Sequence, residues 1–219
     1  MNDYQVTGII IKSEPIGDYD RRLVLLTKEK GKISAFAKGA LRPTNRFMGC
    51  VDPFTFGIFS LYAGSSSYSL TKVEVKNYFE GFRKDLNATF YGTYFLEIAD
   101  YFGHENTDNV RLMRLLYRAL TLLLDDSVSN DFVKTVYEMK AVMLEGLFPI
   151  PDENEDFPEG GRRAIRYVYE ARAEDAFSFK VSDETFAELK KKTDSVCKNT
   201  FDKEFKSLSM IAFAEENAE

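Results

Sequence analysis

Hydrophobic and polar residues alternate with a period of two in the first third of the chain. The clearest case is the segment 32–38, which is typical of a half-buried β-strand. Its apolar side chains fall on one face, and the other face carries Lys32, Ser34, Phe36 and Lys38. Similar short segments, rich in β-branched and aromatic residues, lie at 5–12, 22–27, 54–62 and 68–76.

Turn-forming residues separate these five predicted strands, at 13–18, 28–31, 38–47 and 63–67. Five short strands with a long connection after the third predict a small closed or partly open barrel of the OB type. An SH3-like barrel would give almost the same pattern. We therefore expect an all-β N-terminal domain over residues 1–80.

From Gly81 the hydrophobic period changes to about 3.6 residues, which indicates amphipathic helices. Three helices are predicted, separated by polar breaks at 104–108 and 125–127. Because short connections favour antiparallel neighbours, we expect an all-α helical domain over residues 81–219. The apolar stripes that predict its core are Leu86, Phe90, Tyr94, Ile98 and Tyr101, then Leu112, Leu116, Ala119, Leu120 and Leu123, then Val128, Phe132, Val136, Met139, Met143 and Leu147.

An acidic segment at about 149–161 contains Pro and Gly and has no periodicity, so it predicts an exposed loop. A short helix is expected at 162–172 and an extended turn at 177–181. Ser182 can cap a further helix whose first turn is acidic, which suits the helix dipole. Phe201, Phe205 and Leu208 are expected to return the C-terminal segment to the bundle.

Composition and charge divide the chain at the same place. A hydrophobic fraction of 44% with 19 Phe and 12 Tyr is typical of a globular protein. The formal net charge of -6 combines +3 in residues 1–80 with -9 in residues 81–219. This asymmetry indicates a basic binding module joined to an acidic body. The chain shows neither a membrane span nor a signal peptide, so a cytoplasmic location is expected.

The connection at 38–47 carries the most informative cluster of cations. Gly39 and Pro43 favour a turn there, and a loop rich in cations suits a phosphate backbone better than a buried ion pair. Its cations and its ring are Lys38, Arg42, Arg46 and Phe47. The alternatives remain open at this stage: a solvated basic loop, and packing in the core or barrel mouth for Phe36, Phe47 and Tyr62.

Few residues suggest catalysis or metal binding. His104 stands alone in a predicted loop, and there is no Walker A or GxGxxG sequence. Cys50 and Cys197 are too far apart in sequence for a CxxC metal site, and we expect ordinary thiols. Asp18 and Asp20 would suit a metal-dependent nuclease, although local bonds to the backbone are the more common role of such turn residues. We therefore expect no enzyme activity, no metal and no cofactor.

Three segments in order, 17–27, 38–47 and Pro53-Phe54, resemble the N-terminal region of the RecO family of bacterial recombination mediators. A weaker resemblance returns at 205–208. It implies an N-terminal OB domain, a helical domain and a nucleoid-associated location. It also implies binding and annealing of single-stranded DNA, partnership with RecR and single-strand-binding protein, and loading of RecA; double-stranded DNA is left open.

The chain departs from this family at about residues 150–165. Many members carry a four-cysteine zinc site there, whereas this chain has the acidic segment and no cysteine. Leu41, Thr44 and Asn45 stand where other members hold additional cations. The resemblance therefore implies neither a zinc site nor the strongest DNA affinity for this chain.

The leading hypothesis is a non-catalytic mediator whose cations neutralise phosphates while Phe36 and Phe47 stack on bases. A protein-interaction scaffold without DNA binding is the alternative. A cationic stripe of Arg111, Arg114 and Arg118 is a candidate for the acidic tail of single-strand-binding protein. The cations assigned to DNA are Arg21, Arg22, Lys32, Lys38, Arg42 and Arg46.

Overall fold

A computed structural model describes residues 3–65, 67–152 and 157–216. The chain divides into two compact units. The first comprises Met1–Glu80 with Ala99–Met113, and the second comprises Gly81–Ile98 with Arg114–Glu219. The end of the first helix and the start of the second therefore belong to the same unit as the strands. The division expected at residue 80 assigns both of these helical segments to the second domain.

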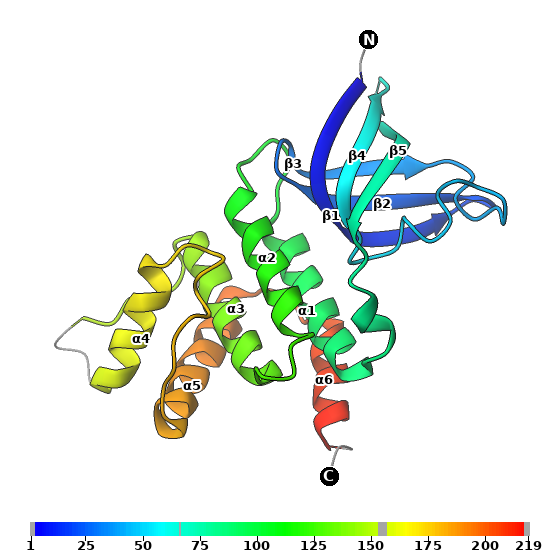
Figure 1. Ribbon diagram of the computed structural model, residues 1–219. Coiled ribbons are helices and arrows are strands. Elements are labelled where there is room, and N and C mark those ends of the chain that lie inside the picture. The colour runs from blue at the N-terminus through cyan, green and yellow to red at the C-terminus, as the bar shows by residue number, and fades with distance from the viewer. Residues whose placement is uncertain (1–2, 66, 153–156, 217–219) are drawn as a thin grey trace. The chain divides into compact units, whose positions relative to one another are not determined.

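The first unit is a closed barrel of five strands, as predicted (Figure 1). Around the barrel the order is β1-β2-β3-β5-β4, with antiparallel neighbours except for the parallel pair β3 and β5. This order is that of an OB barrel. The strands are β1 (Asp3–Ile16), β2 (Asp20–Thr27), β3 (Gly31–Ala37), β4 (Phe56–Ala63) and β5 (Tyr68–Asn77).

Strand β1 extends further than the sequence predicts, because residues 13–16 continue it instead of forming a turn. Its first half pairs with β4 and its second half with β2, and the register shifts between Ile10 and Lys12. Pro15 is tolerated because β4 no longer pairs with β1 beyond Ile9, so the missing N–H is not needed for a ladder. A long, bent β1 is what closes the barrel.

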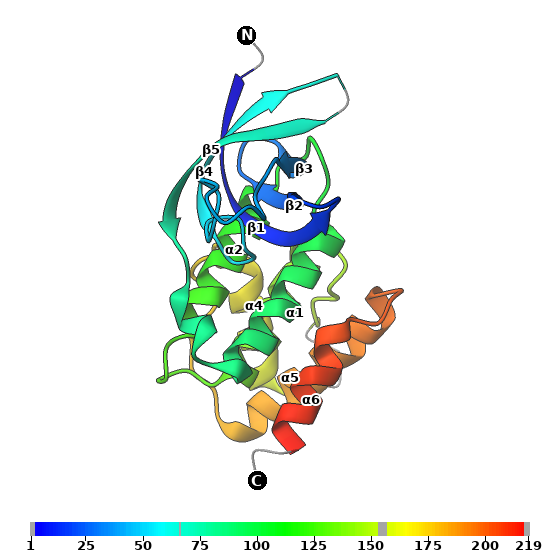
Figure 2. The same ribbon diagram turned by 90° about the vertical axis from the view of Figure 1, so that its right-hand side faces the viewer.

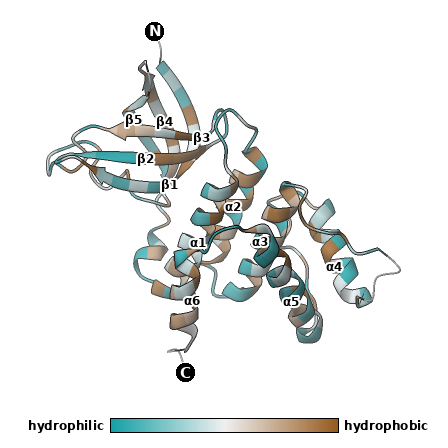
Figure 3. Ribbon diagram, turned by 180° about the vertical axis from the view of Figure 1, so that it is seen from behind, coloured by the Kyte–Doolittle hydropathy of each residue, from teal (hydrophilic) through white to brown (hydrophobic). Residues whose placement is uncertain are grey.

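Alternation along the strands separates the barrel core from its outer surface. In β3 the residues from Gly31 to Ala37 are alternately buried and half-buried, as the period-two pattern predicts. Figure 3 shows β2 changing from hydrophilic at its start to hydrophobic further along. The core combines strand residues such as Ile10, Leu25 and Phe59 with Phe47 and Val51 from the connection between β3 and β4.

The loop between the first two helices docks on the β2–β3 turn within the first unit. Lys32 N donates to His104 O at 2.9 Å, and Asn106 N donates to Lys30 O at 3.0 Å. Gly31 has φ +67° there, and a Cβ at this position would lie 2.3 Å from His104 O. Glycine is therefore required by both conformation and close approach.

In the described part of the chain, a short 3-10 turn (Glu80–Arg83) and six α-helices follow the strands (Figure 2). Helix α3 is the most buried, with an unbroken run of buried residues from Thr135 to Met143, and it packs against α4 and α5. The predicted helical domain is confirmed. The helices are α1 (Leu86–Phe102), α2 (Val110–Leu122), α3 (Asn130–Leu144), α4 (Glu159–Glu170), α5 (Asp183–Thr200) and α6 (Lys206–Glu216).

Helix boundaries differ from the predictions in two places. Helix α4 begins at Glu159, inside the predicted loop, and residues 153–156 of that loop lie outside the described residues. A Cβ at Gly161 would lie 2.5 Å from the Phe157 ring, so a glycine is needed for this close approach. Leu86 and Leu147 are exposed although they fit the apolar stripes, since each lies at or beyond a helix end. Ser182 caps α5 as predicted, accepting a hydrogen bond from Thr185 N at 3.3 Å.

A buried lysine caps helix α4 at its C-terminal end. The Nζ atom of Lys140, on α3, donates to the carbonyl oxygens of Val168, Tyr169 and Ala171 at 2.6, 3.0 and 2.7 Å. A cation suits the negative end of the helix dipole, and these last carbonyls have no partner within the helix. Among the described residues, no helix combines the length and apolar character needed to cross a membrane.

Candidate nucleic-acid interface

Two connections join to form one corner of the barrel: the β1–β2 turn and the loop 38–47. Asp20 Oδ1 accepts a hydrogen bond from Gly39 N at 2.7 Å. Tyr19 O accepts a hydrogen bond from Leu41 N at 2.9 Å. Gly39 has φ +68°, a conformation that favours glycine. Two of the segments that resemble the RecO family are therefore hydrogen-bonded to each other.

The loop itself is a compact series of turns. Arg42 N donates to Gly39 O at 2.9 Å, and Asn45 N donates to Arg42 O at 3.0 Å. Asn45 Oδ1 accepts from Phe47 N at 2.8 Å, so Asn45 has a role in holding the loop together. A loop held this way presents its side chains at fixed positions, which lowers the entropy cost of binding a ligand.

Three cations of this loop are exposed: Lys38, Arg42 and Arg46. No carboxylate among the described residues lies within 4.0 Å of their charged groups. The Arg42 guanidinium lies 4.6 Å from the centre of the Tyr19 ring, and that of Arg46 lies 4.9 Å from the centre of the Phe47 ring. We name Tyr19, Lys38, Arg42 and Arg46 the basic corner.

Phe47 does not occupy the position expected for a base-stacking residue. Its side chain is only 3% exposed and belongs to the barrel core, because the loop turns back into the barrel after Arg46. Tyr19 is 51% exposed on the neighbouring turn and offers a ring instead. No local sequence pattern indicates a role for Tyr19, since its proximity to Arg42 depends on contacts between segments about 20 residues apart.

The other cations assigned to DNA have different surroundings. Arg21 lies 3.5 Å from Asp52 and donates to Ser13, and Lys32 donates to Asp100 Oδ1 at 3.1 Å. These two are partly buried and their charges are balanced locally, so they are weaker candidates for phosphate contacts. Arg22 is exposed, and its Nε donates to Ser34 Oγ at 3.0 Å.

A groove of about 580 Å³ lies on the outer face of β2 and β3, next to the β4–β5 turn. Arg22 and Phe36 both line this groove, and they are direct partners in the β2–β3 register. Phe36 is half-buried, as expected for the polar face of β3. The structure thus brings Arg22 and Phe36 together, and it brings Lys38, Arg42 and Arg46 together at the basic corner.

The nuclease alternative has little support from this geometry. Asp20 uses a carboxylate oxygen to hold Gly39, which is a structural role. Among the residues that the structure describes, no group of three His, Cys, Asp or Glu side chains is placed to hold a metal ion. Burial raises the pKa of the thiols of Cys50 and Cys197, so both are poor nucleophiles at neutral pH.

The arginines assigned to a partner all lie on helix α2, but they do not have equivalent surroundings. Arg114 lies 3.3 Å from Glu174, which balances its charge. Arg111 falls in the first unit, whereas Arg114 and Arg118 fall in the second. The predicted stripe is therefore interrupted by an ion pair on a part-exposed surface.

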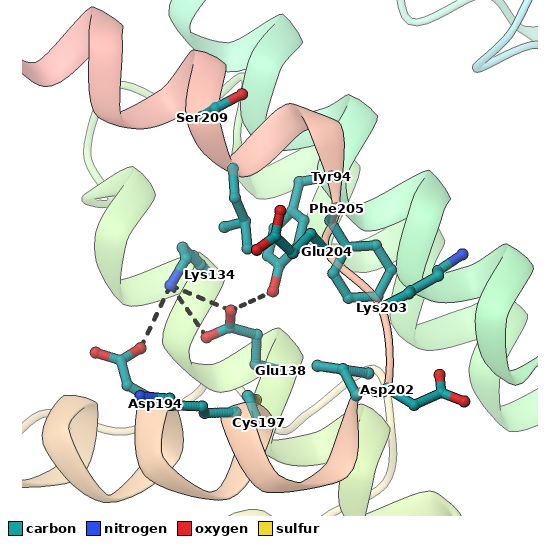
Figure 4. A pocket seen from close by; sticks show the side chains of 13 residues that line it. Tyr94, Lys134, Glu138, Asp194, Cys197, Asp202, Lys203, Glu204, Phe205 and Ser209 are labelled. Carbon is teal, nitrogen blue, oxygen red and sulfur yellow. Dashed lines mark hydrogen bonds and ion pairs between the residues drawn. The ribbon is translucent and has the colours of Figure 1, made fainter.

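The second unit contains a buried polar cluster that sequence reasoning missed (Figure 4). Glu138 is 2% exposed and accepts a hydrogen bond from the Tyr94 hydroxyl at 2.6 Å. Lys134 lies 3.1 Å from Glu138 and 3.6 Å from Asp194. The cluster borders a cavity of about 670 Å³, which is also lined by Phe201 and Phe205 among others. Its members come from three helices, so no local sequence pattern predicts it.

Burial and charge shift the titration of this cluster. Burial raises the pKa of Glu138, and Lys134 with the Tyr94 hydroxyl only partly opposes this. Burial lowers the pKa of Lys134, but the carboxylates of Glu138 and Asp194 more than offset it, so that pKa lies above its usual range. The polar groups are satisfied by one another, which indicates a structural cluster rather than a reactive one.

The fold and the basic corner define a class: an OB-barrel protein with a helical second unit. Residues 1–79 match the model for the recombination protein O N-terminal region, and residues 83–152 match that for its C-terminal region. The chain belongs to the RecO family.

Relatives with the name DNA repair protein RecO support this assignment over different lengths. The protein of Acetivibrio thermocellus is 26% identical over 96% of this chain and 97% of its own length. Those of Alkaliphilus metalliredigens and Bacillus subtilis are 33% and 30% identical over 65% of this chain. These two matches span 58% and 55% of the relatives, which is less than two thirds of each.

Proposed function

We propose that this chain is a non-catalytic DNA repair protein whose barrel binds single-stranded DNA at the basic corner. One observation carries the proposal: Lys38, Arg42 and Arg46 are exposed on a hydrogen-bonded loop with no carboxylate partner among the described residues. Cations held apart from carboxylates attract phosphates, and release of the counterions around DNA then favours binding.

The aromatic residues suit a single strand better than a duplex. Tyr19 is exposed beside Arg42, and Phe36 lines the groove with Arg22. Unpaired bases can stack on such rings, whereas paired bases are stacked on each other. Contacts to the phosphate backbone leave the base edges free to pair, which would permit annealing of a second strand.

Membership of the family extends the proposal to a role in recombination. In this role the chain anneals single strands, acts with RecR, and helps to load RecA onto DNA coated by single-strand-binding protein. The proposed contacts for the acidic tail of that protein are the α2 arginines, and Arg118 is the stronger candidate of the second unit because Arg114 is paired with Glu174.

The test is a titration of labelled single-stranded DNA at several salt concentrations. If Arg22, Lys38, Arg42 and Arg46 each contact a phosphate, the slope of log affinity against log salt will be about -3. Replacing Arg42 and Arg46 by Ala should weaken binding and reduce the steepness of the slope by about 1.4, since each lost contact removes about 0.7.

The matched control is the double variant Arg166→Ala with Arg172→Ala. These arginines are exposed in the second unit, and the substitutions change the net charge by the same amount. The control should keep the wild-type slope. An unchanged slope in the Arg42 and Arg46 variant would mean that the basic corner does not contact DNA phosphates. If wild type itself fails to bind DNA at moderate salt, a protein-interaction scaffold becomes the better explanation.

A further inference from the structure

The groove on the outer face of β2 and β3 has a chemistry that differs from the basic corner. It runs beside the short parallel seam between β3 and β5, where the described residues form two pairs, Ala35 with Tyr68 and Phe36 with Ser69. Its volume of about 580 Å³ is in the range of small-ligand sites and is sufficient for one nucleotide. The groove residues that matter here are Arg22, Ser34, Phe36, Tyr68 and Glu105.

Two half-buried rings line the groove, those of Phe36 and Tyr68. Tyr68 is supported from outside the groove, because its ring meets the edge of the Tyr4 ring with centres 6.3 Å apart. Lys30 Nζ lies 4.2 Å from the centre of the Tyr4 ring and 5.8 Å from that of Tyr68. A ring held by such neighbours is a suitable stacking surface for a base, and Lys30 adds a positive charge beside Tyr68.

Arg22 supplies the guanidinium group for a phosphate at the same groove. The Nε atom of Arg22 donates to Ser34 Oγ at 3.0 Å. This bond fixes the guanidinium by one edge and leaves its terminal amino groups for another acceptor. The residue is exposed, and no carboxylate among the described residues forms an ion pair with it. A guanidinium in this state binds a phosphate oxygen well.

Glu105 adds an acidic residue to the groove lining, where a site for phosphates alone would not place one. It belongs to the loop docked on the β2–β3 turn, where its backbone forms an isolated antiparallel β-bridge with Gly31. The neighbouring bond from Asn106 N to Lys30 O and the bond from Asn109 Nδ2 to His104 O at 2.9 Å hold this loop in place. A carboxylate that lines a groove together with stacking rings can accept a hydrogen bond from the amino group of a base.

We propose that this groove is a nucleobase pocket of the single-strand site, and that Glu105 makes it prefer cytosine to thymine. Phe36 and Tyr68 stack on the base, Arg22 binds an adjoining phosphate, and Glu105 accepts a hydrogen bond from the cytosine N4 amino group. Thymine presents the O4 acceptor at the equivalent position, so it repels the carboxylate. This inference rests on the proposed binding of single-stranded DNA and adds a base preference to it.

The experiment compares labelled (dC) and (dT) oligonucleotides of equal length in competition for the full chain. Wild type should bind the (dC) strand about fivefold more tightly, the lower end of the discrimination that a direct base contact provides. Glu105→Gln, which keeps the size and removes the charge, should reduce this ratio to near one. Tyr68→Leu should weaken binding of both strands, because stacking is lost for either base.

The outcomes separate this inference from the proposed function. Arg42→Ala with Arg46→Ala should weaken binding of the (dC) and (dT) strands equally and keep the preference for (dC), since the basic corner contacts phosphates. Equal binding of the two strands by wild type, or a preference unchanged in Glu105→Gln, would overturn the base preference while leaving DNA binding intact. Failure to bind either strand would overturn the proposed function itself. Circular dichroism of each variant checks that the fold is retained.

Discussion

Asp20 illustrates how one residue can support two opposite interpretations. Its position in an acidic turn before a strand suits a metal ligand, but its Oδ1 accepts a hydrogen bond from Gly39 N. That bond holds the loop carrying Arg42 against the turn carrying Tyr19. The carboxylate therefore supports the basic corner by holding its two segments in place, although its charge opposes binding of a polyanion.

This role predicts different results for two substitutions of Asp20. Asp20→Ala removes the acceptor, and we expect several-fold weaker binding of single-stranded DNA although a negative charge is lost. Asp20→Asn keeps an acceptor for Gly39 N and removes the negative charge, so its affinity should equal or exceed that of wild type. Both are measured by titration of labelled DNA.

A nearby carboxylate provides the control for this comparison. Asp18 is exposed in the same turn and makes no hydrogen bond or ion pair within the described residues. Asp18→Ala changes the net charge as Asp20→Ala does, and it should strengthen binding slightly. Weaker binding in Asp18→Ala as well would contradict a positioning role that is particular to Asp20.

At the scale of elements, helix α4 depends on a side chain from another helix. Its last carbonyls accept hydrogen bonds from Lys140 of α3, which is only 4% exposed. A buried cation is costly to desolvate, and three short bonds to carbonyl oxygens compensate for this. The short helix therefore needs α3 for its stability as well as for its position.

We expect Lys140→Met to lower the free energy of unfolding by about 2–4 kcal/mol, because it leaves several buried carbonyls without a donor. Methionine keeps most of the hydrocarbon volume, so the loss reports mainly on the ammonium group. Denaturant unfolding followed by circular dichroism measures the change. Lys191→Met, at an exposed position of α5, is the control, and a loss of similar size there would contradict the capping role.

At the scale of the whole molecule, the chain alternates between its two units. It leaves the first unit after Glu80, returns for Ala99–Met113, and then completes the second unit. The loop that returns supplies the bonds to Lys30 and Lys32 and also contains Glu105. The barrel and its proposed nucleobase pocket are therefore complete only when part of the helical sequence is present.

The buried cluster of the second unit predicts a loss of stability at alkaline pH. Burial raises the pKa of the Cys197 thiol above its usual 9.0, and the nearby carboxylates hold the pKa of Lys134 above its usual 10.5. In both cases the folded state keeps a proton that the unfolded state releases, so the free energy of unfolding falls as the pH rises. We expect this decline to begin near pH 9.0 and to steepen towards pH 10.5.

Urea unfolding at a series of pH values measures this dependence, with the helical circular dichroism signal as the probe. Cys197→Ala should make the decline between pH 9.0 and pH 10.5 shallower, because the unfolded variant has one thiol fewer to ionise while Cys50 still contributes. Exposed Lys198→Ala is the control and should keep the wild-type dependence. A free energy of unfolding that stays constant from pH 8 to pH 10.5 would contradict the protonation states assigned to the cluster.

Much of the fold follows from local patterns, and the errors occur where local patterns compete with tertiary contacts. The alternation in 32–38 correctly predicted which side of β3 is buried. Pro15 suggested a turn but lies in β1, since its strand has only one neighbour there. Phe47 suggested a stacking ring but fills the core, because an irregular loop has no period from which burial can be predicted.

The amino-acid sequence by itself determined the two kinds of secondary structure, the point where one replaces the other, and the cations of the loop 38–47. These are properties of neighbouring residues, and periodicity or composition reveals them. Only the tertiary structure decided that Tyr19 lies beside Arg42, that Lys32 is paired with Asp100, and that Glu105 reaches the groove. Each of these depends on which distant segments meet when the barrel closes, and closure is a property of the whole fold.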